Sequence, residues 1–253
     1  MVSIDVALTA AESDRAALMA IYEANPEAQG DLTNWGSEKP LNQWRGVNIN
    51  AEGRVTYFEL YELDLKVLPS KIGDLTALEV LYLYITQLTE IPESIGKLTA
   101  LKELELRNNQ LTEIPSSIGD LTSLKFLYLS DNQLTEIPES IGKLTALTNL
   151  YLNNNQLKTI PEEIGKLTAL TFLDLDNNQL KTIPEEIGKL TALSTLYLNN
   201  NQLKTIPEEI GKLTALTFLD LGTNPLTSIP SSVCELGSSM GSNYFRIDDP
   251  SLC

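Results

Sequence analysis

LTALTNLYLNNNQLKTIPEEIGK, residues 144–166, and LTALTFLDLDNNQLKTIPEEIGK, residues 167–189, are consecutive stretches that decide the fold of this chain. They differ only at Asn149/Phe172, Tyr151/Asp174 and Asn153/Asp176. Seven such 23-residue units follow one another, beginning at Leu75, Leu98, Leu121, Leu144, Leu167, Leu190 and Leu213. A fixed period of this kind predicts one elongated domain of stacked units.

Each unit follows the pattern LxxLxLxxNxLxxIPxxIGx. The LxL portion predicts a short strand with its leucines on the buried side. The proline, for example Pro161, lacks an N–H and so turns the chain off the sheet. The IPxxIG segment then predicts a helical turn on the opposite side, ended by its glycine. Because one unit cannot bury its own leucines, we expect stacking to drive folding.

An asparagine recurs where the chain leaves each strand. These residues are Asn109, Asn132, Asn155, Asn178, Asn201 and Asn224. A buried side-chain amide at this point can satisfy backbone groups of adjacent turns, so we predict a structural ladder. Thr86 and Leu63 replace the asparagine near the N-terminal end, where the ladder is expected to be incomplete.

The composition excludes several classes of partner. The 253 residues include 18 basic and 34 acidic side chains, and the net charge of −16 repels phosphate backbones and anionic lipid surfaces. Histidine is absent, so the commonest general base and metal ligand are missing. No stretch approaches the roughly eighteen apolar residues that span a bilayer. We therefore expect a soluble chain with no nucleic-acid partner, no membrane partner and no cofactor.

The N-terminal region lacks the repeat. MVSIDVALTAAESDR has no basic start and carries Asp5 within its apolar stretch, so it predicts no secretion signal. The protein is then either intracellular or secreted with its leader removed. Ser13 is expected to cap a helix over DRAALMAIYEA that covers the first strand edge. Trp35 and Trp44 are expected to fill a small core beside it.

The repeat fades in before its first full copy. The apolar positions of the later units are matched by Val55, Phe58, Leu60, Leu65 and Leu68. This predicts an N-terminal helical cap over 1–52, one degenerate and seven full repeats over 53–235, and a C-terminal cap over 236–253. Cys234 and Cys253 are either a disulfide that staples the C-terminal cap or two unpaired thiols.

LxxLxLxxNxL at a 23-residue period with IPxxIG resembles the leucine-rich repeat family, over roughly residues 53 to 235. The resemblance implies an α/β solenoid, a right-handed curved horseshoe with a parallel β-sheet on its concave face and short helical or 3-10 turns on its convex side. It also implies a binding module, because most known members bind proteins or other ligands. The repeat length is similar to the intracellular Ras-group type, found also in bacteria and protists; plant receptor repeats usually carry one more residue.

The N-terminal region is similar to another branch of that family. SDRAALMAIYEAN, Trp35 and WRGVNI, residues 44–49, resemble the cap of plant-receptor-like repeats, which follows CxWxGVxC. Asn42 and Ile49 stand at its two cysteine positions, so the disulfide of that cap is absent. Units four and six differ only at Thr148/Ser194 and Asn149/Thr195, which indicates recent duplication or consensus engineering.

Functional residues are expected on the outward side of the strands. Counted from the first leucine of each strand motif, positions 3, 5 and 7 point outward on the concave face, because side chains alternate along a strand. We call these 24 positions the concave grid. Position 3 is Tyr57, Val80, Glu103, Phe126, Asn149, Phe172, Thr195 and Phe218; position 5 is Glu59, Tyr82, Glu105, Tyr128, Tyr151, Asp174, Tyr197 and Asp220; position 7 is Tyr61, Tyr84, Arg107, Ser130, Asn153, Asp176, Asn199 and Gly222.

The concave grid holds ten of the chain's fourteen tyrosines and phenylalanines (nine plus five). Rings beside carboxylates, with Arg107 as the single cation, fit a partner that presents Lys or Arg. We therefore predict a non-enzymatic, monomeric module for a protein ligand with a basic patch. The ligand-binding residues expected are Tyr82, Tyr84, Glu105, Arg107, Phe126, Tyr128, Tyr151, Asn153, Phe172, Asp174, Asp176, Tyr197, Asn199, Phe218 and Asp220.

Three alternatives stay open. Asp174 and Asp176 flank one inward leucine and are the best candidates for acid–base chemistry or an oxygen-only calcium site. A surface array for ice or polysaccharide is the second, because a threonine column repeats with the units: Thr76, Thr99, Thr122, Thr145, Thr168, Thr191 and Thr214. A hydroxyl bonded to nearby backbone in a turn also explains that column. The third is an engineered consensus scaffold without a native ligand.

Overall fold

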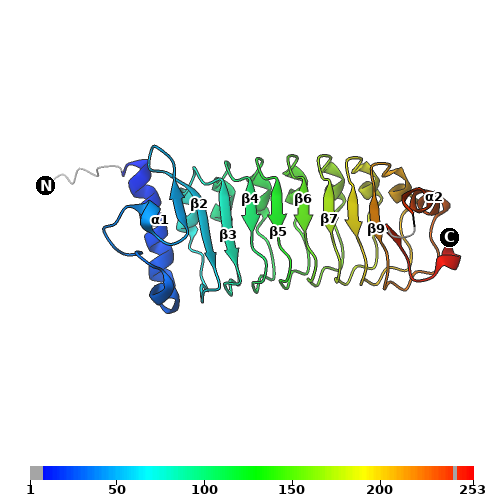
Figure 1. Cartoon of the computed structure of the whole chain (residues 1–253), viewed down its shortest axis with the longest axis horizontal. Helices are drawn as coiled ribbons and strands as arrows, with labels where there is room; N and C mark the ends of the chain where they lie inside the picture. Colours follow the sequence, from blue (N-terminus) through cyan, green and yellow to red (C-terminus); the bar gives the residue numbers. More distant parts are fainter. Residues whose placement is uncertain (1–7, 242–243) are drawn as a thin grey trace.

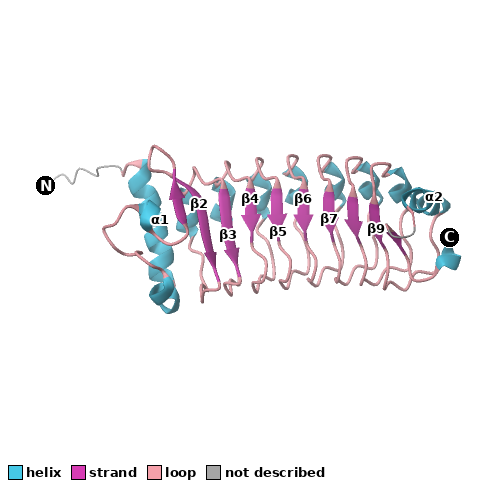
Figure 2. Ribbon diagram, in the orientation of Figure 1, coloured by secondary structure: helices cyan, strands magenta, loops and turns pink. Residues whose placement is uncertain are grey.

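The chain forms a right-handed solenoid in which a row of strands makes one face and short helices make the other (Figures 1 and 2). The computed structural model describes residues 8–241 and 244–253, so Asp5 and most of the apolar stretch around it lie outside the described residues. The strands are β1 Val47–Ile49, β2 Val55–Tyr61, β3 Val80–Tyr84, β4 Glu103–Glu105, β5 Phe126–Tyr128, β6 Asn149–Tyr151, β7 Phe172–Asp174, β8 Thr195–Tyr197, β9 Phe218–Asp220 and β10 Phe245–Arg246.

These ten strands form one sheet in the order of the sequence. All neighbours from β2 to β10 pair in parallel, whereas β1 pairs with β2 in antiparallel orientation. The expectation that a helix covers the first strand edge is therefore wrong, because β1 occupies that edge. Helix α1, Ala10–Ala24, instead packs against the first 3-10 helix of the repeats.

Pro230 of the seventh full unit is followed by an α-helix, but a 3-10 helix follows the proline of the degenerate copy and of each of the six earlier full units, as expected. These helices are η3 Ser70–Asp74, η4 Glu93–Lys97, η5 Ser116–Asp120, η6 Glu139–Lys143, η7 Glu162–Lys166, η8 Glu185–Lys189 and η9 Glu208–Lys212. The role expected for the glycine is wrong, since Gly119 lies inside η5 and has no left-handed φ. A Cβ built on Gly119 would lie 2.5 Å from the carbonyl oxygen of Ser140 in the next unit. The glycine is thus required by the close approach of neighbouring helices.

The core is a continuous stack of leucines and isoleucines from unit to unit. In the fourth unit, Leu147 and Leu150 have no exposed surface. Beside them, Asn155 Nδ2 donates to the carbonyls of Leu129 and Leu152 at 2.9 and 3.1 Å, and its Oδ1 accepts from Leu134 N–H at 3.0 Å. The same arrangement recurs at the other ladder asparagines. At Thr86 the ladder is incomplete, because its hydroxyl donates to Asn109 Oδ1 and makes no bond to a backbone carbonyl of the described residues. The asparagine ladder is confirmed.

The region before the repeats extends the core of the array, and the ring centroids of Trp35 and Phe58 lie 5.8 Å apart. Thr9, not Ser13, caps α1: the Thr9 hydroxyl accepts from Glu12 N–H, and the Glu12 carboxylate accepts from Thr9 N–H. Trp35 and Trp44 are buried with ring centroids 5.3 Å apart, as expected. Two 3-10 helices, η1 Pro26–Asp31 and η2 Leu41–Gln43, lie in this region. No helix within residues 8–241 and 244–253 is long and apolar enough to cross a membrane.

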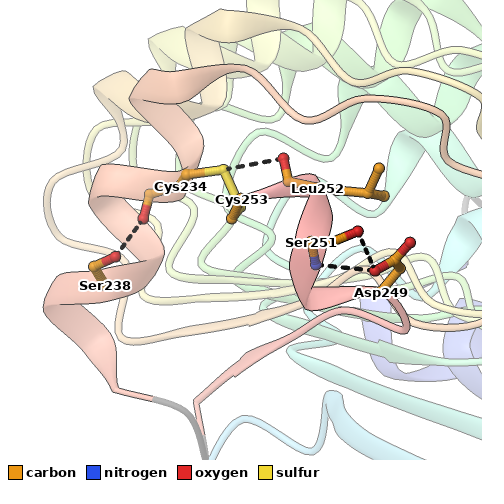
Figure 3. Close-up of a disulfide and its surroundings, with 6 residues drawn as sticks. All are labelled: Cys234, Ser238, Asp249, Ser251, Leu252 and Cys253. Carbon is orange, nitrogen blue, oxygen red and sulfur yellow. Dashed lines mark hydrogen bonds between the residues drawn. A yellow bond between two sulfur atoms is a disulfide. The ribbon is translucent and has the colours of Figure 1, made fainter.

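A disulfide closes the C-terminal end. Helix α2, Ser231–Met240, covers η9, and the 3-10 helix η10, Pro250–Leu252, follows β10. Cys234 on α2 is bonded to Cys253, the last residue (Figure 3). The bridge therefore ties both sides of β10 to the end of the array, and the bridged alternative holds.

Candidate ligand-binding surface

The strand register places the concave grid as the sequence predicts. Residues at the same position of neighbouring strands lie side by side in the sheet. Along position 5 these are Tyr82, Glu105, Tyr128, Tyr151, Asp174, Tyr197 and Asp220, and the position-3 residues from Val80 to Phe218 are aligned in the same way. The leucines between these positions are fully buried, because alternate side chains of a strand point to opposite faces. The predicted binding residues from β3 to β9 therefore share one face of the sheet.

Six rings of this face form a continuous row, which we call the aromatic ridge: Phe126, Tyr128, Tyr151, Phe172, Tyr197 and Phe218. Tyr128 and Tyr151 stack with centroids 4.7 Å apart, and Tyr151 lies 4.6 Å from Phe172. The ridge changes from position 5 to position 3 at Phe172 because Asp174 interrupts the tyrosine column. All six side chains are half-buried, so each ring keeps surface for a partner.

A second group of residues lies at the N-terminal end of the grid. Glu59 accepts hydrogen bonds from the hydroxyls of Tyr57 and Tyr84, at 2.7 and 3.2 Å, and Glu103 accepts one from Tyr82. Burial, these bonds and the nearby carboxylates raise the pKa of all three phenols. Tyr82, Tyr84, Glu105 and Arg107 line a shallow hollow that Tyr128 shares with the aromatic ridge. The tyrosines stay neutral and act as hydrogen-bond donors here.

The acidic residues at position 5 are engaged with their own strands. Glu105, Asp174 and Asp220 each accept the N–H two residues further on, at 2.9 to 3.0 Å. Glu105 and Asp220 are buried, and burial raises the pKa of Glu105. Burial raises the pKa of Asp174 from 3.8 to about 6. The hydrogen bond from the Asp176 N–H lowers this pKa, whereas the negative charge of the Asp176 carboxylate raises it further. These carboxylates are less available to a partner than their positions in the sequence indicate.

Changing Asp174 to asparagine is expected to stabilise the fold at neutral pH by on the order of 1 kcal/mol, allowing for solvent screening at this half-exposed group. Because folding disfavours the charged form of Asp174, ionisation of this group lowers the stability of the fold. This loss of stability is complete above pH 6 and disappears below pH 3.8, where Asp174 is protonated in the folded and the unfolded chain alike. Thermal unfolding of the intact chain and of the Asp174→Asn variant, at several pH values between these limits, measures the difference in stability. An equal gain at both ends of the range contradicts this explanation.

Amide groups hold position 7 together. The Ser130 hydroxyl donates to Asn153, and Asn199 Nδ2 donates to Asp176 Oδ1 at 2.7 Å. Asn200, from the following position, donates to the same oxygen. Asp174 and Asp176 are therefore both occupied by donors of the chain. In the part of the chain that the structure describes, no group of three or more Asp, Glu or Cys side chains is placed to hold a metal ion.

The C-terminal end adds a residue that the sequence analysis missed. Strand β10 pairs with β9 and places Arg246 beside Asp220, with Arg246 Nη1 3.6 Å from Asp220 Oδ2. The same guanidinium lies 5.2 Å from the Phe218 ring, at the end of the aromatic ridge. Arg246 lies outside the repeat pattern, so no periodic signal pointed to it. Arg107 is therefore accompanied by a second cation on this face.

The threonine column does not make the hydroxyl bonds that a turn role requires. All seven side chains are exposed. Among the described residues, the only hydrogen bond to any of these hydroxyls comes from Arg54 to Thr76. The turn is instead closed by backbone groups, as in Thr145 N–H to Lys143 C=O at 2.9 Å. The explanation of the column as backbone-bonded hydroxyls is wrong.

Family models match most of the repeat region. A model of leucine-rich repeat regions matches residues 53–124 and 94–171, and a model of two-copy leucine-rich repeats matches residues 168–208 and 191–233. No match to the chain was found among curated protein sequences.

Solved structures share the architecture. A leucine-rich repeat protein of Leptospira interrogans is 40% identical, with a TM-score of 0.69 over 74% of this chain and 48% of that one. A second similar structure is the leucine-rich repeat ectodomain of the receptor kinase GASSHO1/SCHENGEN3 of Arabidopsis thaliana, in complex with Casparian strip integrity factor 2. It is 31% identical, with a TM-score of 0.73 over 88% of this chain and 31% of that one. The present chain thus spans less than half the length of either. A plant ice-binding protein is 25% identical, with a TM-score of 0.67 over 86% of this chain and 80% of that one.

Proposed function

Because this chain belongs to the leucine-rich repeat family, we propose that it is a non-enzymatic binding module that recognises a protein ligand through its concave grid. The observation that carries the proposal is the aromatic ridge. Six half-buried rings in contact give a rigid surface that a partner can cover at little entropic cost. The Arabidopsis ectodomain with its bound factor supports a protein ligand.

The proposed ligand presents a basic patch. Asp174 lies between Tyr151 and Tyr197, and Glu103 lies beside Phe126, so carboxylates flank the rings on the sheet. A Lys or Arg side chain can approach a ring face and a carboxylate together there. Arg107 and Arg246 already make such contacts with Tyr84 and Phe218, at 5.2 Å in each case.

Paired affinity capture tests this function. The intact chain and a variant with Tyr128→Ala and Tyr151→Ala serve as baits in the same extract, and a third bait carries Lys158→Ala and Lys181→Ala on the convex side. We expect a protein that is enriched on the intact chain, retained by the lysine variant and lost by the tyrosine variant. A captured protein that all three baits retain equally contradicts the proposal.

A second candidate function is binding to ice. It is favoured by the exposed threonine column and by the similarity to a plant ice-binding protein over 80% of that chain. This candidate predicts thermal hysteresis that is lost when Thr145 and Thr168 are changed to lysine. The protein-ligand proposal predicts no hysteresis from the intact chain, so one measurement separates the two.

A further inference from the structure

An exposed apolar side chain stands at the edge where the strands of the first repeats end. Ile85, directly after β3, is 44% exposed. It follows Tyr84, whose ring stacks on Tyr61 with centroids 5.2 Å apart, and Tyr61 is itself 38% exposed. Of the five large apolar side chains that are exposed in the described residues, Tyr61 and Ile85 thus lie in neighbouring units. Ile85 itself lies outside the concave grid, whereas Tyr61 and Tyr84 belong to its position 7.

The backbone at Ile85 makes this choice of residue unusual. Its φ is +57°, a left-handed conformation that β-branched residues rarely adopt. The equivalent positions of five later units are Asn108, Asp131, Asn154, Asn177 and Asn200, all with φ between +52° and +56°. Asparagine and aspartate tolerate this conformation. Local stability therefore does not account for an isoleucine at this position.

Ile85 lines a hollow of about 570 Å³, together with Glu62, Asp64, Gln87, Asp131 and other residues. No basic side chain lines it. Asp64 Oδ1 is buried without a hydrogen-bond partner, while its Oδ2 lies 3.5 Å from Lys66 Nζ. Arg45 and Arg107 lie over the Tyr61 and Tyr84 rings, at 5.7 and 5.2 Å. The hollow combines the apolar side chains of Leu63 and Ile85 with Glu62 and Asp131, which form no ion pair among the described residues.

We propose that this edge, centred on Ile85, is a second docking surface, which receives a short basic segment of a protein through one apolar side chain. The apolar side chain contacts Ile85, and flanking Lys or Arg side chains approach Glu62, Asp64 and Asp131. This surface is separate from the aromatic ridge, which begins at Phe126, and its occupation does not require the concave grid.

The test uses a synthetic peptide, Gly-Lys-Lys-Leu-Lys-Lys-Gly, titrated into the ¹⁵N-labelled chain. We expect amide shifts that cluster at residues 62–64, 85–87 and 108–110. Replacing the peptide's leucine with serine should weaken binding at least fivefold. Shifts confined to the concave grid, or equal binding of the serine peptide, overturn this inference and leave the proposed function of the concave grid standing.

Two variants separate binding from stability. Ile85→Asn introduces the residue of the neighbouring units, so the midpoint of thermal unfolding should stay constant or rise while peptide affinity falls at least fivefold. Thr223→Asn is the matched control, because Thr223 is also β-branched with φ +53° but lies at the far end of the array; its affinity should not change. Asp131→Asn should weaken binding without loss of fold, and unchanged affinity in both Ile85→Asn and Asp131→Asn overturns the inference.

Discussion

Changing Tyr128 and Tyr151 together to alanine is expected to weaken binding of the captured protein by on the order of 2 kcal/mol or more, about thirtyfold in Kd. The two rings are stacked at the centre of the aromatic ridge, and losing both also removes the support for Phe172. Titration calorimetry with the purified partner measures the change. Affinity within twofold of the intact chain would rule out the ridge as the binding surface.

The fold of this double variant should be preserved. Both rings lie on the outward side of their strands, whereas the core at this level is formed by Leu127 and Leu150, which are fully buried. Circular dichroism and thermal unfolding check this point. A companion variant with Tyr128→Phe and Tyr151→Phe keeps the rings and removes the hydroxyls, so retained affinity there assigns the effect to ring contact.

Changing Gly119 to alanine is expected to destabilise the fold by about 3 kcal/mol. The new methyl group would lie 2.5 Å from the carbonyl oxygen and 2.8 Å from Cβ of Ser140. Because these atoms belong to the next unit's backbone or stand beside it, a side-chain rotation cannot relieve the clash. The spacing of units three to seven relative to the first two full units must open, which weakens leucine contacts across the whole layer.

Urea unfolding at constant temperature measures this loss of stability. Gly30→Ala is the matched control, since nothing lies within 4 Å of a Cβ at Gly30 and its φ is not left-handed; its effect should stay within about 0.5 kcal/mol. A Gly119→Ala variant as stable as the control would show that the units are not packed at this distance.

The repeated part of the fold could be predicted from sequence because the same physical constraint recurs at each unit. Leu147 and Leu150 are buried against the neighbouring units, as are the leucines at the same positions of every unit. Once this is known, the strand register, the placement of the helices and the role of Asn155 follow for the whole array. The departures lie where the period gives no information. Strand β1 and Arg246 are placed by contacts between the repeats and the ends of the chain.

Other features depended on local chemistry rather than on the period. Thr9 and Glu12 form a capping box whose T-x-x-E signature was present in the sequence, yet Ser13 was preferred. The hydrogen bond that the Asp176 N–H donates to the Asp174 carboxylate is short-range and gives no periodic signal. The aromatic ridge changes from position 5 to position 3 because Asp174 stands in the tyrosine column, which the residue types alone could have indicated.

Oxidative footprinting of the chain, alone and with the captured protein bound, tests the central claim most directly. Hydroxyl radicals modify exposed tyrosine and phenylalanine rings, so the rings of the concave grid serve as reporters on the surface in question. We predict that a saturating partner protects Tyr128, Tyr151 and Tyr197, while the half-buried Tyr22 on helix α1 keeps its free reactivity. Unchanged modification of all three ridge tyrosines, with protection confined to the side of the 3-10 helices, would contradict the account.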